Sequence, residues 1–481
     1  MNTEPIYLDH QATTPLDEHV LEAMLPFLTR EYGNPSSPHA FGRTAAKAVR
    51  TARRQVTDLV GAKSELEVVF TSGATEANHL AIVGAALAAR PRGGHIVTTA
   101  IEHKAVLAAC QRLVDHHDFT LTRVGVDKHG RVHPADIAAV LTPHTVLVSV
   151  MHANNEIGTL QRLAAIAEIT APRGIILHTD AAQSAGCGFL DVAELGVDLA
   201  SLSAHKLHGP KGIGALYIRG GTRLTAQQTG GGQERGLRGG TPNVPAIVGF
   251  GAAAHLITTD AVPPPTRVRA LRDRLQDRLL AAIPGATLNG HPHRRLPGNL
   301  SLTLPGIAAS TGSACNAGSG EPSHVLTAIG LTRDQARATL RVSLGRTTTD
   351  TDIDQAADLI TRTAHTLIPM TATAALNRRP NRAAPTEAPS RPAGAAFEHP
   401  PPSRQRHEGA PAFLKRTGQS VKGKARRLDP RPTRRPVVSD GCDDAGTGTT
   451  TGEDEEQHRW GNRTTSTSRS TATTPHLPDV L

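Results

Sequence analysis

Short apolar runs alternate with longer helical stretches in the first half of the chain. Four runs rich in β-branched residues predict buried strands, at 94–100, 145–152, 174–181 and 197–206. The stretches 104–117 and 161–174 between them predict helices. Apolar runs of this length favour a parallel sheet with both faces covered. The pattern therefore predicts an α/β fold with a mostly parallel sheet between layers of helices.

A second, smaller region follows with a different order of elements. An amphipathic helix at 268–283, a strand at 298–304 and a helix at 351–368 predict an α+β domain. We expect a large α/β domain at 1–255, with residues 1–15 packing on the smaller domain, which spans 256–370.

The last part of the chain, 371–481, is dominated by Pro, Arg, Thr, Ser and Gly. It has no periodic apolar positions, so burial cannot offset the entropy of ordering it, and we predict a disordered tail. The tail holds 18 of the 52 basic and 12 of the 43 acidic residues, so it carries +6 of the net charge of +9. It is either a basic arm that contacts nucleic acid or an unselected extension, and its scarcity of aromatics favours the extension.

Composition narrows the class of protein. The four cysteines among 481 residues have neither paired nor metal-type spacing, which is typical of a reducing compartment. The N-terminus lacks the pattern of a signal peptide, and no apolar run reaches the roughly 18 residues that span a bilayer. We expect a cytoplasmic protein without a membrane partner.

Polar residues follow the ends of the predicted strands at similar places. These residues are His103, Asn155, Asp180 and Lys206. Ligands of parallel sheets bind at the carboxyl ends of the strands, so the four residues predict one shared site.

The segment 70–82 reads as strand, small-residue turn and helix. Its residues Ser72, Gly73, Ala74 and Thr75 would offer backbone N–H groups at a helix N-terminus, which suits a phosphate. The alternative is an ordinary helix N-cap by Ser72 or Thr75.

Asp180 and Lys206 bear on which ligand the predicted site would bind. Alone, the aspartate could be a helix cap or a metal ligand, and the lysine could reach solvent. Together with a phosphate cradle they match the needs of pyridoxal phosphate. The lysine would form a Schiff base and the acid would hold the pyridinium nitrogen.

Ten motifs in sequence order carry a family resemblance. They read YLDHQATTP, YGNPSSPHAFGR, TSGATEANHLAI, EHKAV, MHANNEIG, HTDAAQSAG, SAHKLHGPKGIGALY, GGGQERGLRGGTPN, STGSAC and LRVSLGR. This series resembles the NifS/IscS-type cysteine desulfurases and covers about residues 5 to 370. The resemblance implies a fold-type I pyridoxal phosphate enzyme of the class-V aminotransferase family that forms a homodimer.

The resemblance implies roles for individual residues. Lys206 would be the Schiff-base lysine, Asp180 the pyridinium partner, and His103 the imidazole that stacks on the cofactor and moves protons. Arg341 would bind the substrate carboxylate, and Asn155 would contact both ring and substrate. The remaining cofactor contacts would be Gln183 on the ring and Ala74, Thr75, Ser203 and His205 at the phosphate, with Thr241 reaching the other protomer's site.

Cys315 lies in a run of small residues, 308–320. The resemblance implies that its thiolate attacks the sulfur of L-cysteine, giving L-alanine and a persulfide that passes to an acceptor protein, either a scaffold or a sulfur carrier. A free thiol ionises only near pH 8.5, so a base, His103 by position, would take its proton. Cys315 is also a candidate iron–sulfur ligand, and no other metal ligand is expected.

The chain departs from the family pattern before Cys315. About a dozen residues, the length of one helix, are missing near 305–308. Smaller departures are Thr229, Gly239 and His79. The sequence therefore predicts a cysteine desulfurase, with two alternatives: a selenocysteine lyase-like or other pyridoxal phosphate lyase, or a cofactor-binding homologue with impaired turnover.

Overall fold

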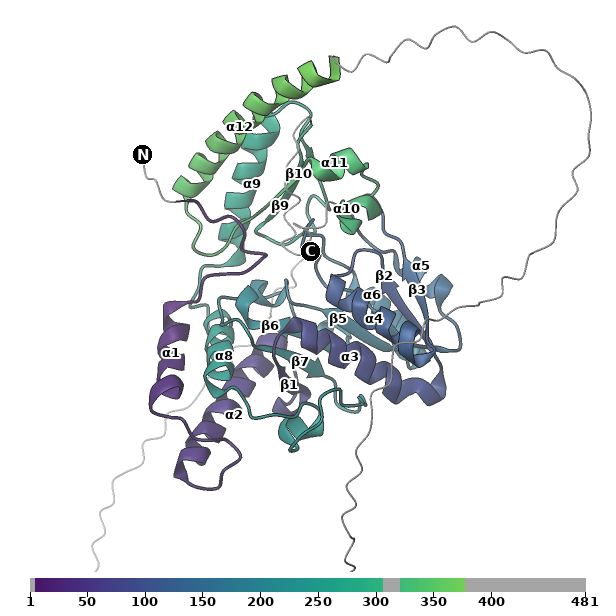
Figure 1. Ribbon diagram of the computed structural model, residues 1–481, viewed down its shortest axis with the longest axis vertical. Helices are drawn as coiled ribbons and strands as arrows, with labels where there is room; N and C mark the ends of the chain where they lie inside the picture. The colour runs from purple at the N-terminus through teal and green to yellow at the C-terminus, as the bar shows by residue number, and fades with distance from the viewer. Residues whose placement is uncertain (1–4, 306–320, 377–481) are drawn as a thin grey trace, which may run out of the picture. The chain divides into compact units, whose positions relative to one another are not determined.

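The computed structural model describes residues 5–305 and 321–376, with side chains as far as residue 367. Within these residues the strands form two sheets (Figure 1). The larger sheet has seven strands, which lie in the order β1 (Val68–Thr71), β7 (Gly214–Ile218), β6 (Leu199–Ser203), β5 (Ile176–Asp180), β4 (Thr145–Ser149), β2 (His95–Thr99) and β3 (Thr120–Val124). Only β7 runs antiparallel to its neighbours there. The predicted α/β fold with a mostly parallel sheet is confirmed.

Helices cover both faces of this sheet because its strands are apolar on both sides. Val69 of β1 packs with the helices of one face, α3 (Ala74–Ala89) and α4 (Lys104–His117). Its neighbours Val68 and Phe70 pack with those of the other face. These are α1 (Glu18–Thr29), α2 (Ala40–Val60), α5 (Pro134–Val140), α6 (Leu163–Thr170), α7 (Val192–Leu195) and α8 (Val244–Thr258).

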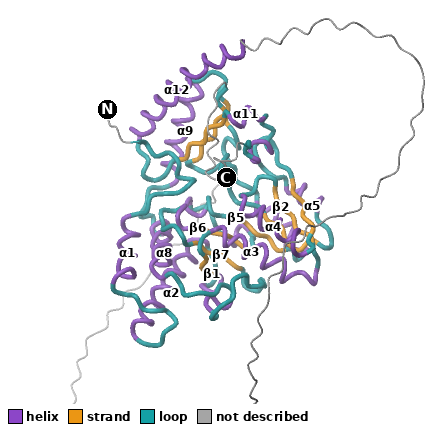
Figure 2. The backbone as a smooth tube through the Cα atoms, in the orientation of Figure 1, coloured by secondary structure: helices purple, strands orange, loops and turns teal. Residues whose placement is uncertain are grey.

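The smaller sheet has three antiparallel strands, in the order β10 (Thr339–Ser343), β9 (Asn299–Thr303) and β8 (Thr287–Leu288). Helices α9 (Pro265–Ala282) and α12 (Asp350–Leu376) lie side by side against it, as Figures 1 and 2 show. Arg274 and Arg278 of α9 both pair with Asp354 of α12. The sheet and the two helices share one apolar core.

Two short helices, α10 (His324–Ala328) and α11 (Arg333–Arg337), pack elsewhere. Their apolar residues contact Ile101, Met151 and Ile157, which lie on the loops after β2 and β4 of the larger sheet. These helices therefore face the strand ends at which the sequence predicts the site.

The predicted elements agree with the structure to within a few residues. The helix predicted at 104–117 has these bounds. The strand predicted at 197–206 ends earlier, at Ser203, and a 3₁₀ turn, Ala204–Lys206, follows. The helix predicted at 161–174 ends at Thr170, before a turn that contains Pro172.

The described residues belong to one compact unit, 1–381, so the predicted boundary between 255 and 256 stays a prediction. The prediction of a disordered tail is wrong for residues 371–376, which are the last residues of helix α12. From 377 onward the predicted tail lies outside the described residues. No helix in the described part of the chain is long and apolar enough to cross a bilayer.

The N-terminal segment 8–14 connects the two sheets. Leu8 packs on the core of the smaller sheet, and Asp9 forms a parallel bridge with Ser343 of β10. Five residues later, the Thr14 hydroxyl donates to the carbonyl of His205, which lies just after β6. The segment therefore passes directly over the carboxyl ends of the central strands.

Candidate active site

A cavity of about 560 Å³ lies at the carboxyl ends of β4, β5 and β6. Ten of the residues predicted for the site line it: Ala74, Thr75, His103, Asn155, Asp180, Gln183, Ser203, His205, Lys206 and Arg341. Thr241 is exposed and does not line it, and Cys315 lies outside the described residues. The structure therefore brings together predicted site residues from six separate stretches of the sequence.

One end of the cavity is the N-terminus of α3. Its N-cap is Gly73, and no side chain caps the first turn, so the alternative that Ser72 or Thr75 is an ordinary N-cap is wrong. Gly73 has φ 154° and ψ 178°, a conformation nearly restricted to glycine, and a Cβ there would point into open space. The uncapped backbone donors and the open space beside them suit an anion.

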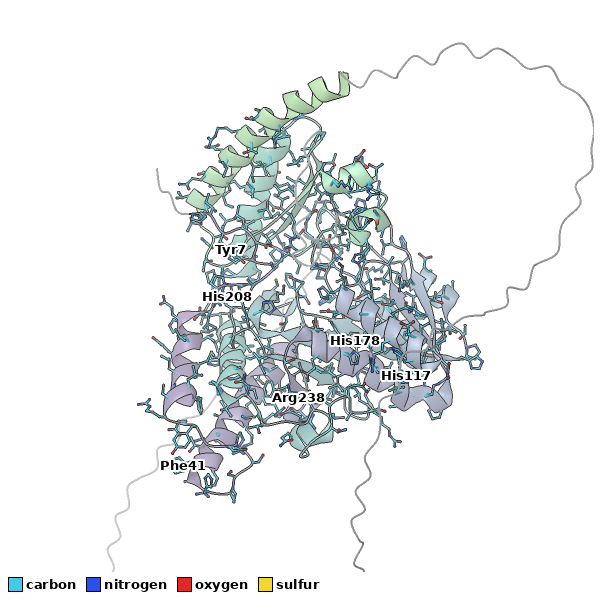
Figure 3. All side chains as sticks on the ribbon, viewed as in Figure 1. Tyr7, Phe41, His117, His178, His208 and Arg238 are labelled. Atoms are coloured by element: carbon cyan, nitrogen blue, oxygen red, sulfur yellow. The ribbon has the colours of Figure 1, made fainter. Side chains whose placement is uncertain are left out.

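Glu76 holds this turn in place. Its carboxylate accepts from the Ser72 N–H at 2.8 Å and from Arg238 at 2.9 Å. Arg238 is labelled in Figure 3. Burial opposes ionisation, but the hydrogen bonds from Ser72 and Arg238 outweigh it and lower the pKa of Glu76. The acid is satisfied by these partners, so it does not exclude an anion from the helix end.

His205 and Ser203 border the same end, on the turn after β6 and at the last residue of that strand. His205 Nδ1 lies 3.1 Å from the Thr13 hydroxyl. Burial, and then the charges of Lys206 and Lys211, lower the pKa of His205 to about 4. The imidazole is therefore neutral near neutral pH and binds through hydrogen bonds, while the two lysines supply positive charge.

The amine of Lys206 points at the N-terminal segment. It donates to the carbonyl of Gln11 and, at 2.9 Å, to that of Ala12. Gln183 donates to the same Gln11 carbonyl at 3.1 Å. The amine is therefore held inside the cavity by two backbone carbonyls, where a bound carbonyl compound could reach it.

Asp180 is the last residue of β5 and is buried. One oxygen accepts from the Ala182 N–H at 3.0 Å, and the other accepts from Asn78 at 2.7 Å. In the described residues no group of three or more His, Cys, Asp or Glu side chains could hold a metal ion. Asp180 is therefore a fixed acceptor on the cavity wall.

Asn78 is a site residue that the sequence analysis missed. It lies inside α3, where all its helical neighbours from Leu80 to Ala86 are apolar and buried. A fully buried amide in such a helix needs a partner, but in the sequence Asn78 is followed by the polar His79, and the hydrophobic pattern gives no signal that Asn78 is buried.

His103 is the N-cap of α4, and its Nδ1 accepts from the Ala105 N–H at 3.2 Å. This contact leaves Nε2 as the ring nitrogen available to a ligand. Beside it, Glu102 is completely buried, and burial raises its pKa to about 8 despite hydrogen bonds from Thr99 and Met151. Glu102 is thus a neutral acid below the cavity at neutral pH.

Arg341 of β10 forms the opposite wall. Its guanidinium donates to the Asn155 carbonyl at 2.8 Å and to Asp9 at 2.6 Å. The side chain is 3% exposed, and Nε has no partner among the described residues. An arginine with donors to spare in a cavity suits a carboxylate.

Helix α10 adds two further contacts to this wall. The Ser323 hydroxyl donates to Glu156 at 2.5 Å, and His324 Nε2 lies 2.9 Å from the Glu102 carbonyl. These contacts join the start of α10 to the loops after β2 and β4, beside the cavity.

Comparison with known proteins identifies this arrangement. A family model described as aminotransferase class-V matches residues 6–356. The chain belongs to the class-V aminotransferase family. It is 47% identical over 371 residues to "Cysteine desulfurase IscS" of Anaeromyxobacter sp. (strain Fw109-5), an alignment that covers 74% of this chain and 91% of that protein.

Solved structures of this family agree with the assignment. A "NIFS-LIKE PROTEIN" is 36% identical with a TM-score of 0.70 and covers 76% of this chain and 100% of that chain. A second, "SspA in complex with cysteine", is 36% identical with a TM-score of 0.64, covering 72% and 100%. These relatives place the chain among the cysteine desulfurases and favour that activity over the selenocysteine lyase alternative.

Pyridoxal phosphate is the cofactor of these class-V enzymes, and the cavity fits it. The uncapped end of α3 and the open space at Gly73 suit the phosphate. Asp180 is a buried acceptor that suits the protonated ring nitrogen, and Lys206 supplies the amine. All three groups line one cavity, as the cofactor requires.

Proposed function

We propose that the protein converts L-cysteine to L-alanine and transfers the sulfur, as a persulfide on Cys315, to an acceptor. The main support is the convergence of Lys206, Asp180 and Arg341 on one cavity in a chain of the cysteine desulfurase family. We further propose that it acts in the cytoplasm as a homodimer in which Thr241 reaches the partner's site.

The cofactor would be held at both ends. Lys206 would bind its aldehyde carbon, Asp180 its ring nitrogen, and the end of α3 with Ser203 and His205 its phosphate. Gln183 would contact the ring. When bound, pyridoxal phosphate withdraws electrons from the amino acid and so weakens the bonds near its α-carbon.

The chain's own residues would bind the substrate and move its protons. Arg341 would hold the carboxylate of L-cysteine, with Asn155 beside it. His103 would accept a thiol proton through Nε2, because Nδ1 already accepts from Ala105. The Cys315 thiolate would then attack the substrate sulfur: an S–S bond forms, the C–S bond breaks, and the carbon keeps the bonding pair and takes up a proton to give alanine.

The test is the formation of alanine and sulfide from L-cysteine by the wild type, Lys206→Ala and Cys315→Ser. We expect Lys206→Ala to lose about a thousandfold or more in alanine formation, because it removes the covalent catalyst. Cys315→Ser should bind cofactor normally but form no protein persulfide.

Two outcomes would contradict the proposal. Alanine formation by Lys206→Ala at the wild-type rate would remove the lysine from the mechanism. Cysteine-dependent sulfide release that persists in Cys315→Ser would reject the persulfide relay. A wild type that takes up pyridoxal phosphate but forms no alanine would instead support the impaired homologue that the short segment near 305–308 predicts.

A further inference from the structure

We propose that Asp9 is a positioning residue for Arg341. It orients the guanidinium, and its negative charge weakens the attraction of Arg341 for the substrate carboxylate. This inference rests on the proposed function, in which Arg341 binds that carboxylate.

The ion pair is close and asymmetric in exposure. Arg341 Nη2 lies 2.6 Å from Asp9 Oδ1, and the side chain of Arg341 is 3% exposed while that of Asp9 is 48% exposed. Nη1 donates to the Asn155 carbonyl, and the buried Nε has no partner in the part of the chain that the structure describes. The guanidinium is thus fixed by two contacts and keeps donors for a third group.

The backbone, and not the ion pair, fixes the position of Asp9. Its neighbours bond to Ser343 of β10: the Ser343 N–H donates to Leu8 at 2.8 Å, and the Gln11 N–H donates to the Ser343 hydroxyl at 2.9 Å. Arg341 and Ser343 are two residues apart on one strand, so their side chains lie on the same face. A neutral residue at position 9 would therefore stay beside Arg341.

Two carboxylates would share one guanidinium when the substrate binds. The like charge of Asp9 disfavours the second carboxylate. Because Asp9 is half exposed, solvent screens this effect, and pairs of this kind change affinity by about two- to fivefold. Asp9 would thus lower the affinity for the substrate carboxylate while it keeps Arg341 correctly oriented.

The matched test compares Asp9→Asn with Asp9→Leu and Tyr7→Phe in the holoenzyme. Asparagine keeps the hydrogen-bond acceptor without the charge, and leucine removes both. Tyr7, labelled in Figure 3, donates to the carbonyls of Asp9 and Thr13. Tyr7→Phe therefore loosens the same segment without changing its charge.

Two probes are titrated calorimetrically. L-Alanine has the carboxylate that Arg341 would bind, and cysteamine lacks it. We expect Asp9→Asn to bind L-alanine about two- to fivefold more tightly and to lower KM for L-cysteine more than it changes kcat. Asp9→Leu should bind L-alanine more weakly than Asp9→Asn. Cysteamine binding should not follow the charge at position 9.

Unchanged or weaker L-alanine binding by Asp9→Asn overturns the inference. A parallel change for cysteamine, or the same effect in Tyr7→Phe, overturns it as well, because the segment and not the carboxylate site would then be responsible. Failure of the proposed function is a different result: a wild type that neither forms alanine nor binds it.

Discussion

The two walls of the cavity are built in different ways. On the larger sheet, Asp180 is fixed by the N–H of Ala182, two residues away, and Lys206 follows the next strand. On the smaller sheet, Arg341 is fixed by Asp9 and by the Asn155 carbonyl, at sequence separations of 332 and 186. The positions of Asp180 and Lys206 thus follow from local strand ends, although Asn78 and Gln11 bond to their side chains from sequence separations of 102 and 195. On the substrate wall, both partners of Arg341 are distant in sequence.

The largest expected effect on activity follows from a substitution of Arg341, on the substrate wall. Arg341→Lys keeps a positive charge, but its donors all sit on one nitrogen and cannot replace the separate guanidinium nitrogens that contact Asn155 and Asp9. Loss of such a buried charged contact costs about 2 kcal/mol or more, so kcat/KM for L-cysteine should fall at least about 30-fold. Steady-state alanine formation measures this change.

The same variant should bind pyridoxal phosphate as the wild type does, because Arg341 lies on the other wall. Arg333→Lys is the matched control, because Arg333 on α11 is exposed and its ion pair with Glu321, at 3.7 Å, is long. An equal loss of cofactor affinity in Arg341→Lys would show that the two walls are not independent.

A smaller effect is expected on the cofactor wall. Asn78→Ala removes the 2.7 Å hydrogen bond to Asp180 and leaves one carboxylate oxygen without that donor. Hydrogen bonds to charged groups contribute about 1.5–3 kcal/mol, so affinity for pyridoxal phosphate should fall about tenfold or more. Titration of the apoprotein with cofactor measures the loss.

Asn78→Asp sharpens this comparison. A second carboxylate at this distance would make one of the pair bind a proton, and the resulting competition should weaken cofactor binding more than alanine does. Cofactor affinity in Asn78→Asp at or above the wild-type value would contradict the assigned role of Asp180.

The last prediction concerns protein stability, and not ligand binding, and tests the buried acid below the cofactor wall. Burial raises the pKa of Glu102 to about 8, so the folded protein keeps a proton that the unfolded chain releases above its ordinary value near 4.5. This contribution to stability is complete below pH 4.5 and is lost as pH rises toward 8. Glu102→Gln does not titrate and should gain stability relative to the wild type over this window, by up to about 1.4 kcal/mol per pH unit.

Thermal melting of both proteins from pH 5 to pH 9 measures the difference. The two curves should separate up to about pH 8 and then stay apart by a constant amount. Curves that remain parallel across the window would show that Glu102 is ionised in the folded protein.

The contrast between the walls also explains what the sequence could predict. Asp180 and Lys206 follow recognisable strands, so their shared site could be predicted from the order of the elements. Asp9 lies in a segment without regular structure, and its partner on β10 comes from the other end of the folded part. Its contact with Arg341 depends on tertiary packing, which a local pattern does not contain.

The family resemblance implied that Arg341 binds the substrate carboxylate, but it did not indicate which residues hold the guanidinium. Asn78 and Glu102 were missed for a related reason: each acts through a neighbour and not on the ligand. Thr241 is exposed, and its predicted reach into a second protomer stays a prediction, as does the role of Cys315.

Helix α3 has a consequence for the dimensions of any ligand. Its first residues form the uncapped end that would bind the phosphate, and three residues after Thr75 it presents Asn78 to Asp180. Three residues of helix rise about 4.5 Å, so one rigid rod sets the spacing between the two anchoring points. A single residue inserted between them would turn the amide by about 100° and break the match, whereas insertions after Ala89 would leave it intact.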